Sequence, residues 1–166
     1  MKKPFINIDQ AAPVLISERI PGAPVKYQGA AVAELSSHIG AKRLGYNLTI
    51  VPPGKCAFPF HNHFGNEEMF FILEGTGELR YGDERFPLRV GDIIACPPGG
   101  PETAHQIINT SPIETLRYLA VSTTRTPDLF QYPDSSKTGA TFHGGPATVV
   151  RIRNRTDDNI DYWDGE

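Results

Sequence analysis

Short apolar segments separated by turn residues dominate the middle of the chain. From Tyr46 to about Ser122, segments such as YNLTIV, EMFFIL, RFPLRV and LRYLAVS alternate with turn signals such as PPGK, EGTG and GDE. Turns spaced by roughly eight to twelve residues are typical of a β-sandwich or a closed barrel. The pattern therefore predicts an all-β core of hairpins over residues 46–122.

The segments that flank this core are expected to be arms of the same domain. Residues 1–45 mix short apolar runs with Pro and Gly, which predicts an extended arm with about one or two strands and no long helix. Residues 123–166 look irregular apart from a predicted half-buried strand at 148–155, where Val150 and Ile152 alternate with arginines. No repeat or low-complexity linker divides the chain, so residues 1–166 are expected to form a single domain.

Composition and charge exclude several classes of protein. The 16 Gly and 15 Pro residues favour short strands and tight turns. A net charge of -3 gives no basic surface for a phosphate backbone, so nucleic acid is not an expected partner. Cys56 and Cys96 form no CxxC pair and are expected to be reduced, buried thiols. No apolar run suits a signal peptide or a bilayer, so we expect a cytoplasmic protein with no membrane partner.

Metal-ligand chemistry is suggested by the segment HNHFGNEEMFFILEG, residues 61–75. In an extended segment, the period of two points His61 and His63 to the same face. The polar residues FGN then allow Glu68 to return on a neighbouring strand. Because side chains alternate, Glu67 would face away from Glu68. A second signal, between Gly91 and Asn109, offers His105 as a further ligand.

Together the two segments resemble the two sequence motifs of the cupin superfamily. The matching residues are Gly54, His61, His63, Glu68 and Gly75 in the first motif and Gly91, Pro97, Gly99, His105 and Asn109 in the second. The resemblance implies a double-stranded β-helix, that is, a jelly-roll barrel. It also implies that one metal ion is bound inside the barrel by His61, His63, Glu68 and His105.

One departure from the family pattern concerns the later histidine. The residues GPETA between Gly99 and His105 are more than the motif usually has, and they could displace His105 from the metal. However, the alternation of His105, Ile107 and Asn109 along one strand still allows His105 to point inward. We therefore keep His105 as a predicted ligand. His38 and His143 lie in Gly-flanked segments and are not expected to be ligands.

The chemistry of this donor set points to one divalent transition-metal ion. Three neutral imidazoles and one carboxylate suit iron, manganese, nickel or zinc, and an octahedral ion held in this way keeps positions open. The sequence does not distinguish among these metals. Because side chains alternate along a strand, Phe70 and Ile72 should point inward with Glu68 and line the pocket with apolar surface.

We expect the chain to be a metal-dependent enzyme that acts on a small organic molecule, in the manner of a dioxygenase. One alternative is a redox-neutral isomerase or epimerase of a sugar, which should place a basic residue in the barrel; Arg80 and Arg117 are possible. The other is a non-catalytic binding or sensing protein, although no helix-turn-helix is present. No catalytic residue is assigned. The two arms also predict a homodimer.

Overall fold

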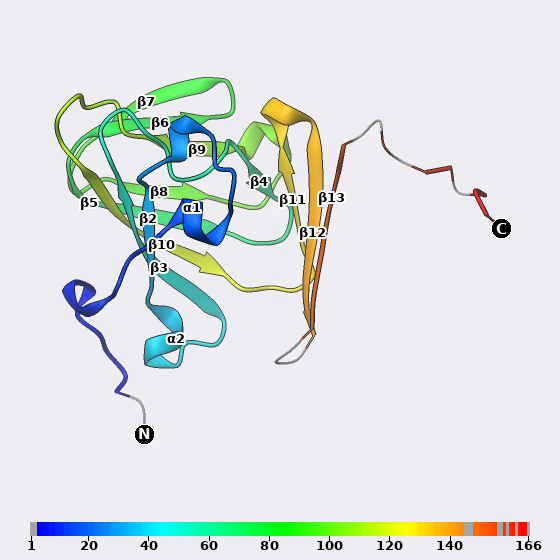
Figure 1. The fold of residues 1–166 in the computed structure, drawn as a ribbon, viewed down its shortest axis with the longest axis horizontal. Coiled ribbons are helices and arrows are strands. Elements are labelled where there is room, and N and C mark those ends of the chain that lie inside the picture. Colours follow the sequence, from blue (N-terminus) through cyan, green and yellow to red (C-terminus); the bar gives the residue numbers. More distant parts are fainter. Residues whose placement is uncertain (1–2, 145–147, 156–157, 159, 162, 166) are drawn as a thin grey trace.

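The computed structural model describes residues 3–144, 148–155, 158, 160–161 and 163–165, and it consists mainly of antiparallel strands (Figure 1). The largest sheet has the strand order β1 (Val14–Leu15), β2 (Ala31–Glu34), β3 (Leu44–Val51), β10 (Leu116–Thr123), β5 (Glu68–Glu74) and β8 (Ile93–Cys96). A three-stranded sheet has the order β7 (Glu84–Leu88), β6 (Gly77–Tyr81) and β9 (His105–Ile108). A four-stranded sheet has the order β13 (Thr148–Arg155), β12 (Lys137–Gly144), β11 (Asp128–Tyr132) and β4 (Asn62–His63).

Helices are short throughout the described residues. The α-helices are α1 (Ile16–Arg19) and α2 (Ser36–Ile39), and the 3-10 helices are η1 (Ile8–Gln10), η2 (Val25–Tyr27), η3 (Pro101–Thr103) and η4 (Pro133–Ser135). None of the helices in the part of the chain that the structure describes is long and apolar enough to cross a membrane.

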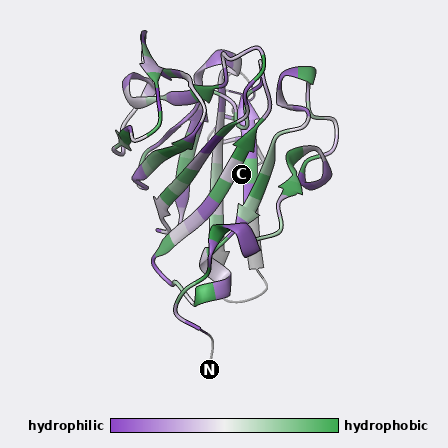
Figure 2. Ribbon diagram, turned by 90° about the vertical axis from the view of Figure 1, so that its left-hand side faces the viewer, coloured by the Kyte–Doolittle hydropathy of each residue, from purple (hydrophilic) through white to green (hydrophobic). Residues whose placement is uncertain are grey.

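The hydrophobic core lies between the six-stranded and three-stranded sheets. Val51, Ile72 and Leu116 of the larger sheet are fully buried, and they cluster with Leu79 and Ile107 of the smaller sheet. Hydrophobic and hydrophilic residues alternate along the strands in Figure 2, as expected for sheets with one buried face. The predicted all-β jelly roll is therefore confirmed, because inward-facing residues of both sheets enclose one interior.

The N-terminal arm agrees with the prediction of short strands. β2 pairs with β3 and thereby extends the sheet of the barrel. The side chains of Ala31, Val32 and Ala33 are buried, so this strand is part of the packed structure. Cys56 and Cys96 are free, buried thiols, as predicted.

The C-terminal arm is more regular than the sequence suggested. The prediction of a single strand after Thr123 is wrong, because β11 and β12 precede β13. Gly139 lies within β12, where the ring of Phe130 occupies the space that a side chain would need. The predicted strand at 148–155 is present, but the prediction of one buried face is wrong for its described side chains, because residues 151–155 are all exposed. The side chain of Val150 lies outside the described residues.

β12 and β13 form a long ribbon at one side of the molecule (Figure 1). β11 joins this ribbon to β4, the short strand that carries His63. The C-terminal arm is thereby hydrogen-bonded to the segment from which two of the predicted ligands come.

Candidate metal centre

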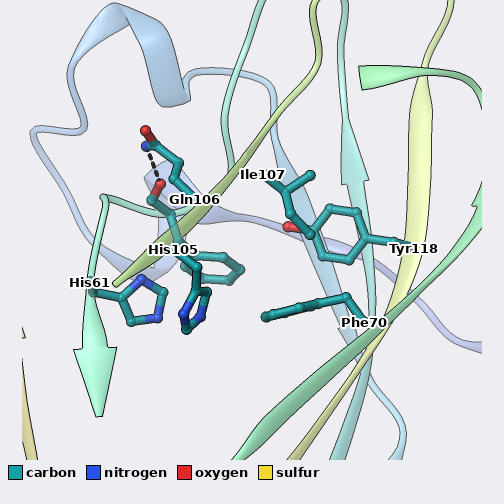
Figure 3. Close-up of a pocket in the computed structure, with 7 residues that line it drawn as sticks. His61, Phe70, His105, Gln106, Ile107 and Tyr118 are labelled. Carbon is teal, nitrogen blue, oxygen red and sulfur yellow. Dashed lines mark hydrogen bonds between the residues drawn. The ribbon is translucent and has the colours of Figure 1, made fainter. Parts of the chain in front are cut away.

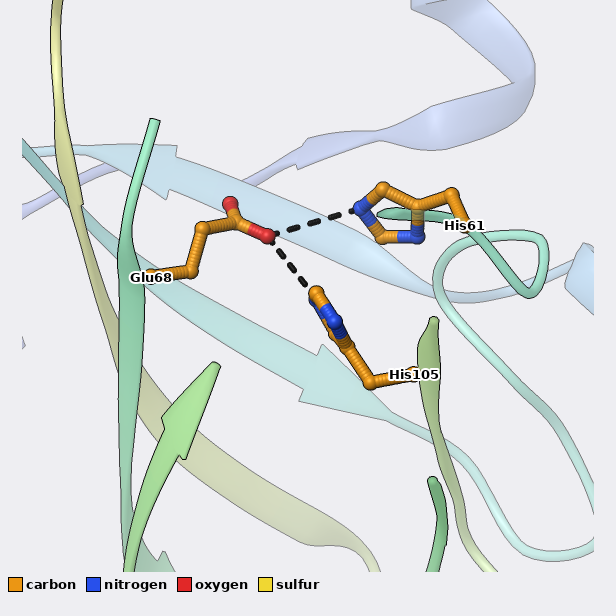
Figure 4. Close-up of side chains that lie close together, drawn as sticks. All are labelled: His61, Glu68 and His105. Carbon is orange, nitrogen blue, oxygen red and sulfur yellow. Dashed lines mark hydrogen bonds and ion pairs between the residues drawn. The ribbon is translucent and has the colours of Figure 1, made fainter. Parts of the chain in front are cut away.

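The predicted ligands come from different strands that meet inside the barrel. His61 precedes β4 and forms an isolated antiparallel bridge with His105 of β9, in which each backbone N–H donates to the other's carbonyl, at 3.2 and 2.8 Å. Residues directly opposite in an antiparallel pair point to the same face, so both imidazoles face the interior. Figure 4 shows how they approach Glu68.

Glu68 reaches the histidines from the opposite sheet. Its strand, β5, pairs with β10 and β8, whereas β4 pairs with β11. The expectation that Glu68 lies on the strand next to the histidine segment is therefore wrong, since β4 belongs to the four-stranded sheet and β5 to the six-stranded sheet. The prediction that Glu68 rather than Glu67 points inward agrees with the structure, in which Glu67 is exposed.

One carboxylate oxygen lies close to three imidazole nitrogens. Glu68 Oε2 is 2.9 Å from Nε2 of His105, 3.5 Å from Nε2 of His61 and 3.6 Å from Nε2 of His63. The donor atoms of His61, Glu68 and His105 all lie within 4.8 Å of one another, and this group could hold a metal ion. The structure thus brings three of the four predicted residues into this group, and the fourth, His63, lies beside it with Nε2 3.6 Å from Glu68 Oε2.

The other nitrogen of each ring has a hydrogen-bond acceptor. Nδ1 of His61 lies 2.8 Å from the carbonyl oxygen of Pro59. Nδ1 of His63 lies 2.9 Å from a carboxylate oxygen of Asp128, and Nδ1 of His105 lies 3.2 Å from the carbonyl oxygen of Thr103. Carbonyl oxygens and ionised carboxylates only accept, so Nδ1 carries the proton and donates in each ring. Nε2 is then the nitrogen of each ring that faces the shared space, as in histidines that bind metals.

The charges at this centre shift the pKa values of its groups. Burial alone would raise the pKa of Glu68, but hydrogen bonds from His105 and His61 and the positive charge of the histidines hold it well below its ordinary value. Burial would lower the pKa of His63, yet the hydrogen bond to Asp128 and the charges of Glu68 and Asp128 raise it. Without a metal, Nε2 of His105 donates to Glu68, and a metal ion would replace this proton.

A small cavity adjoins His61 and His105, the two histidines joined by the isolated bridge (Figure 3). Its lining residues are Phe58, His61, Phe70, His105, Gln106, Ile107 and Tyr118. The cavity volume is about 10 Å³, which is room for about one water molecule. The ring of Phe70 lies 5.5 Å from that of His105 and meets Tyr118 edge-to-face, as predicted for the apolar wall, whereas Ile72, the other residue predicted for it, is not among the lining residues. Burial raises the pKa of Tyr118, so its phenol is neutral.

The extra residues before His105 support this histidine and do not displace it. Pro101–Thr103 form the 3-10 helix η3, and the carbonyl of Thr103 accepts the hydrogen bond from Nδ1 of His105. His105 is buried at the start of β9 and its ring faces Glu68. His38 is exposed on α2, and the side chain of His143 lies outside the described residues.

Sequence reasoning missed Asp128, because its segment was interpreted as irregular. The side chain accepts a hydrogen bond from a predicted ligand that lies 65 residues earlier in the chain. A signal was available in DLFQY, residues 128–132, where alternation places the aromatic residues and the aspartate on one face. The pairing of β11 with β4 could not be predicted, because a strand as short as β4 has no recognisable pattern in the sequence.

These observations define a small jelly-roll barrel with three histidines and a glutamate gathered in its interior. The family model "Cupin domain" matches residues 47–122, a range that contains all four of these residues. The chain is a small protein with a cupin domain at residues 47–122, as the two sequence motifs predicted.

A curated relative and several solved structures resemble parts or all of the chain. An uncharacterised protein of Methanocaldococcus jannaschii is 40% identical over 60 residues, which are 36% of this chain and 45% of that protein. The match therefore spans less than half of the relative's length. A structure described as a sugar phosphate isomerase of the cupin superfamily from Silicibacter pomeroyi has a TM-score of 0.78 and 22% identity, with 97% of this chain and 98% of that chain covered. At this identity the likeness shows the fold alone.

Two further structures are 25% identical to this chain. A predicted oxalate decarboxylase from Thermotoga maritima has a TM-score of 0.58 and covers 73% of this chain and 99% of its own. A polyketide cyclase from Streptomyces resistomycificus has a TM-score of 0.59, and the match covers 75% of this chain and 82% of that protein's chain. The names of these proteins describe different reactions, so function has to be argued from the site.

Proposed function

We propose that this protein is a metal-dependent enzyme that acts on a small organic molecule. His61, His63, Glu68 and His105 would bind one divalent transition-metal ion, which is iron, manganese, nickel or zinc. The observation that carries the proposal is the convergence of three Nε2 atoms on one oxygen of Glu68 while every Nδ1 donates elsewhere. Three nitrogens and one carboxylate oxygen suit such an ion.

A dioxygenase-like reaction is the function that the site supports best. A bound metal with open coordination positions would supply Lewis acidity and a binding place for dioxygen or a substrate oxygen. The space beside His61 and His105 has room for about one water-sized molecule and is walled by Phe70 and Tyr118. These apolar walls lower the local dielectric and so strengthen electrostatic interactions at the site.

A redox-neutral reaction, such as isomerisation of a sugar, is the second candidate. For a phosphorylated sugar, however, the barrel should offer a cation. Among the described residues that line the cavity, none is Lys or Arg. Arg80 instead stacks on Phe60 and pairs with Asp134, and Arg117 pairs with Glu74. The cavity thus favours an uncharged or metal-binding group over a phosphate.

Metal content tests the proposed ligands. We expect His61→Ala and Glu68→Ala to lose most of the bound metal, because each removes a ligand, while the fold persists on the barrel core. Glu67→Ala is the matched control, since Glu67 is the exposed neighbour of Glu68. Elemental analysis of the purified proteins measures the effect. Metal content equal to that of the wild type in both ligand variants would refute the assignment.

The reaction class is tested separately from the ligands. The metal is identified in protein from its native host, and oxygen uptake is followed with a panel of small organic substrates. Oxygen consumption that depends on both the metal and one substrate is the expected result. Zinc together with no oxygen consumption would instead favour the redox-neutral enzyme or the non-catalytic binding protein.

A further inference from the structure

The C-terminal arm contributes a carboxylate to the candidate metal centre. We propose that Asp128 is a positioning residue, which fixes the orientation of the His63 imidazole and strengthens it as a metal ligand. The inference rests on the proposed function, because it requires His63 to bind the metal. Asp128 lies beyond residue 122, where the match to the cupin domain ends.

Strand pairing places Asp128 beside His63. β11 pairs with β4 so that Phe130 is opposite His63, and the N–H of Phe64 donates to the carbonyl of Leu129 at 2.8 Å. Side chains two residues apart on a strand share a face, so Asp128 and Phe130 both point to the side of His63. The ring of Phe130 lies 6.0 Å from that of His63, and Asp128 lies at the edge of the imidazole.

The contact between Asp128 and His63 is close and partly buried. The two carboxylate oxygens are 2.9 and 3.2 Å from Nδ1 of His63. The side chains of His63 and Asp128 are 17% and 18% exposed, so water screens their interaction only in part. An ionised carboxylate accepts the Nδ1 proton, which leaves Nε2 as the nitrogen that faces Glu68.

His63 thereby differs from the other two histidines of the centre. His61 and His105 donate their Nδ1 protons to backbone carbonyls, whereas His63 donates to a charged group. A carboxylate in this position raises the basicity of the ligand nitrogen and restrains rotation of the ring. Removal of Asp128 should therefore weaken metal binding although Asp128 does not itself contact the metal.

The test is a Co²⁺ titration of the metal-free protein, followed by the absorption spectrum of the bound ion. We expect Asp128→Ala to weaken Co²⁺ binding by about ten- to a hundredfold and to alter the spectrum. Asp128→Asn should lose less, because its amide oxygen still accepts the proton from Nδ1. The matched control is Asp134→Asn, which removes a carboxylate that pairs with Arg80, and it should bind Co²⁺ like the wild type.

The double variant His63→Ala/Asp128→Ala separates positioning from general destabilisation. If Asp128 acts through His63, the double variant binds Co²⁺ as His63→Ala does. Unchanged affinity in Asp128→Ala would overturn the inference. The inference would also be overturned if Asp128→Ala lowered the Co²⁺ affinity equally in the wild type and in His63→Ala.

Failure of the proposed function gives a different result. If the wild-type protein binds no Co²⁺, the proposed metal site is wrong, and nitrogen NMR of the His63 ring then decides the role of Asp128. We expect a single tautomer with the proton on Nδ1 in the wild type and a mixture in Asp128→Ala. The same single tautomer in both proteins would overturn the positioning role.

Discussion

Glu68 is the residue on which the electrostatics of the barrel interior depend. Its carboxylate faces three imidazoles, and its pKa is held below the ordinary value of 4.5. Such a group stabilises the folded protein above its unfolded pKa, and this contribution is lost as the pH falls toward the folded pKa. His63 has a raised pKa, so below its ordinary value of 6.5 it is protonated in both the folded and the unfolded state. It therefore does not make the free energy of unfolding depend on pH in that range.

The acid stability of the metal-free protein should therefore depend on Glu68. With a chelator present, we expect the free energy of unfolding to fall more steeply between about pH 5 and pH 3 in the wild type than in Glu68→Gln. Urea denaturation at several pH values measures both slopes. Glu67→Gln serves as the control because its side chain is exposed. Identical slopes in the wild type and Glu68→Gln would contradict the prediction.

β11 and β12 connect packing in the C-terminal arm to the candidate centre. A Cβ atom at Gly139 would lie 2.4 Å from Cε2 and 2.6 Å from Cζ of Phe130. The Phe130 ring has little freedom to move, because it is buried and packs against Tyr132 and His63. The absence of a side chain at Gly139 thus allows the ring to lie beside a predicted ligand.

Gly139→Ala should for this reason destabilise the protein. We expect a loss of about 1–3 kcal/mol in the free energy of unfolding, as for other substitutions that overpack a core. Gly65→Ala is the control, because no atom lies within 4 Å of a Cβ placed there. Urea denaturation compares the two variants with the wild type. Equal stability of Gly139→Ala and Gly65→Ala would show that the ring moves at no cost.

The strands that the sequence predicted correctly are long apolar segments bounded by turn residues. β3, β5 and β10 are seven or eight residues long, and alternate residues are buried in β5 (Phe70 and Ile72) and in β10 (Leu116 and Tyr118). β11 and β12 were missed because Pro133 and Gly139 interrupt that signal. In β4 the pairing partner is far along the chain, so no local pattern revealed it.

The same limits apply to the candidate centre. The spacing of His61, His63 and Glu68 was enough to predict that they face one interior. The prediction that they lie on neighbouring strands was wrong, because the residues between His63 and Glu68 connect two sheets and do not form a hairpin. Asp128 could be found only once the pairing of β11 with β4 was known.

At the scale of the whole molecule, the four-stranded sheet has two different faces. One face carries His63 and Phe130 toward the candidate centre. The other carries Leu129 and Ile152, which are both opposite Ala140 in β12, and Phe142 lies two residues farther along that strand. Leu129, Phe142 and Ile152 are 43%, 43% and 51% exposed, so they form a partly exposed apolar surface. Such a surface suits contact with a second copy of the chain.

We therefore predict a homodimer that buries this surface. Ile152→Asp should shift the protein toward the monomer, because it places a charge in the apolar contact, and metal binding should be retained because the opposite face carries His63. Ile113→Asp is the matched control, since Ile113 is 82% exposed in the loop between β9 and β10. Light scattering after size-exclusion chromatography measures the mass of each protein. A monomeric wild type would contradict the prediction, and a dimer in Ile152→Asp as stable as in Ile113→Asp would place the interface elsewhere.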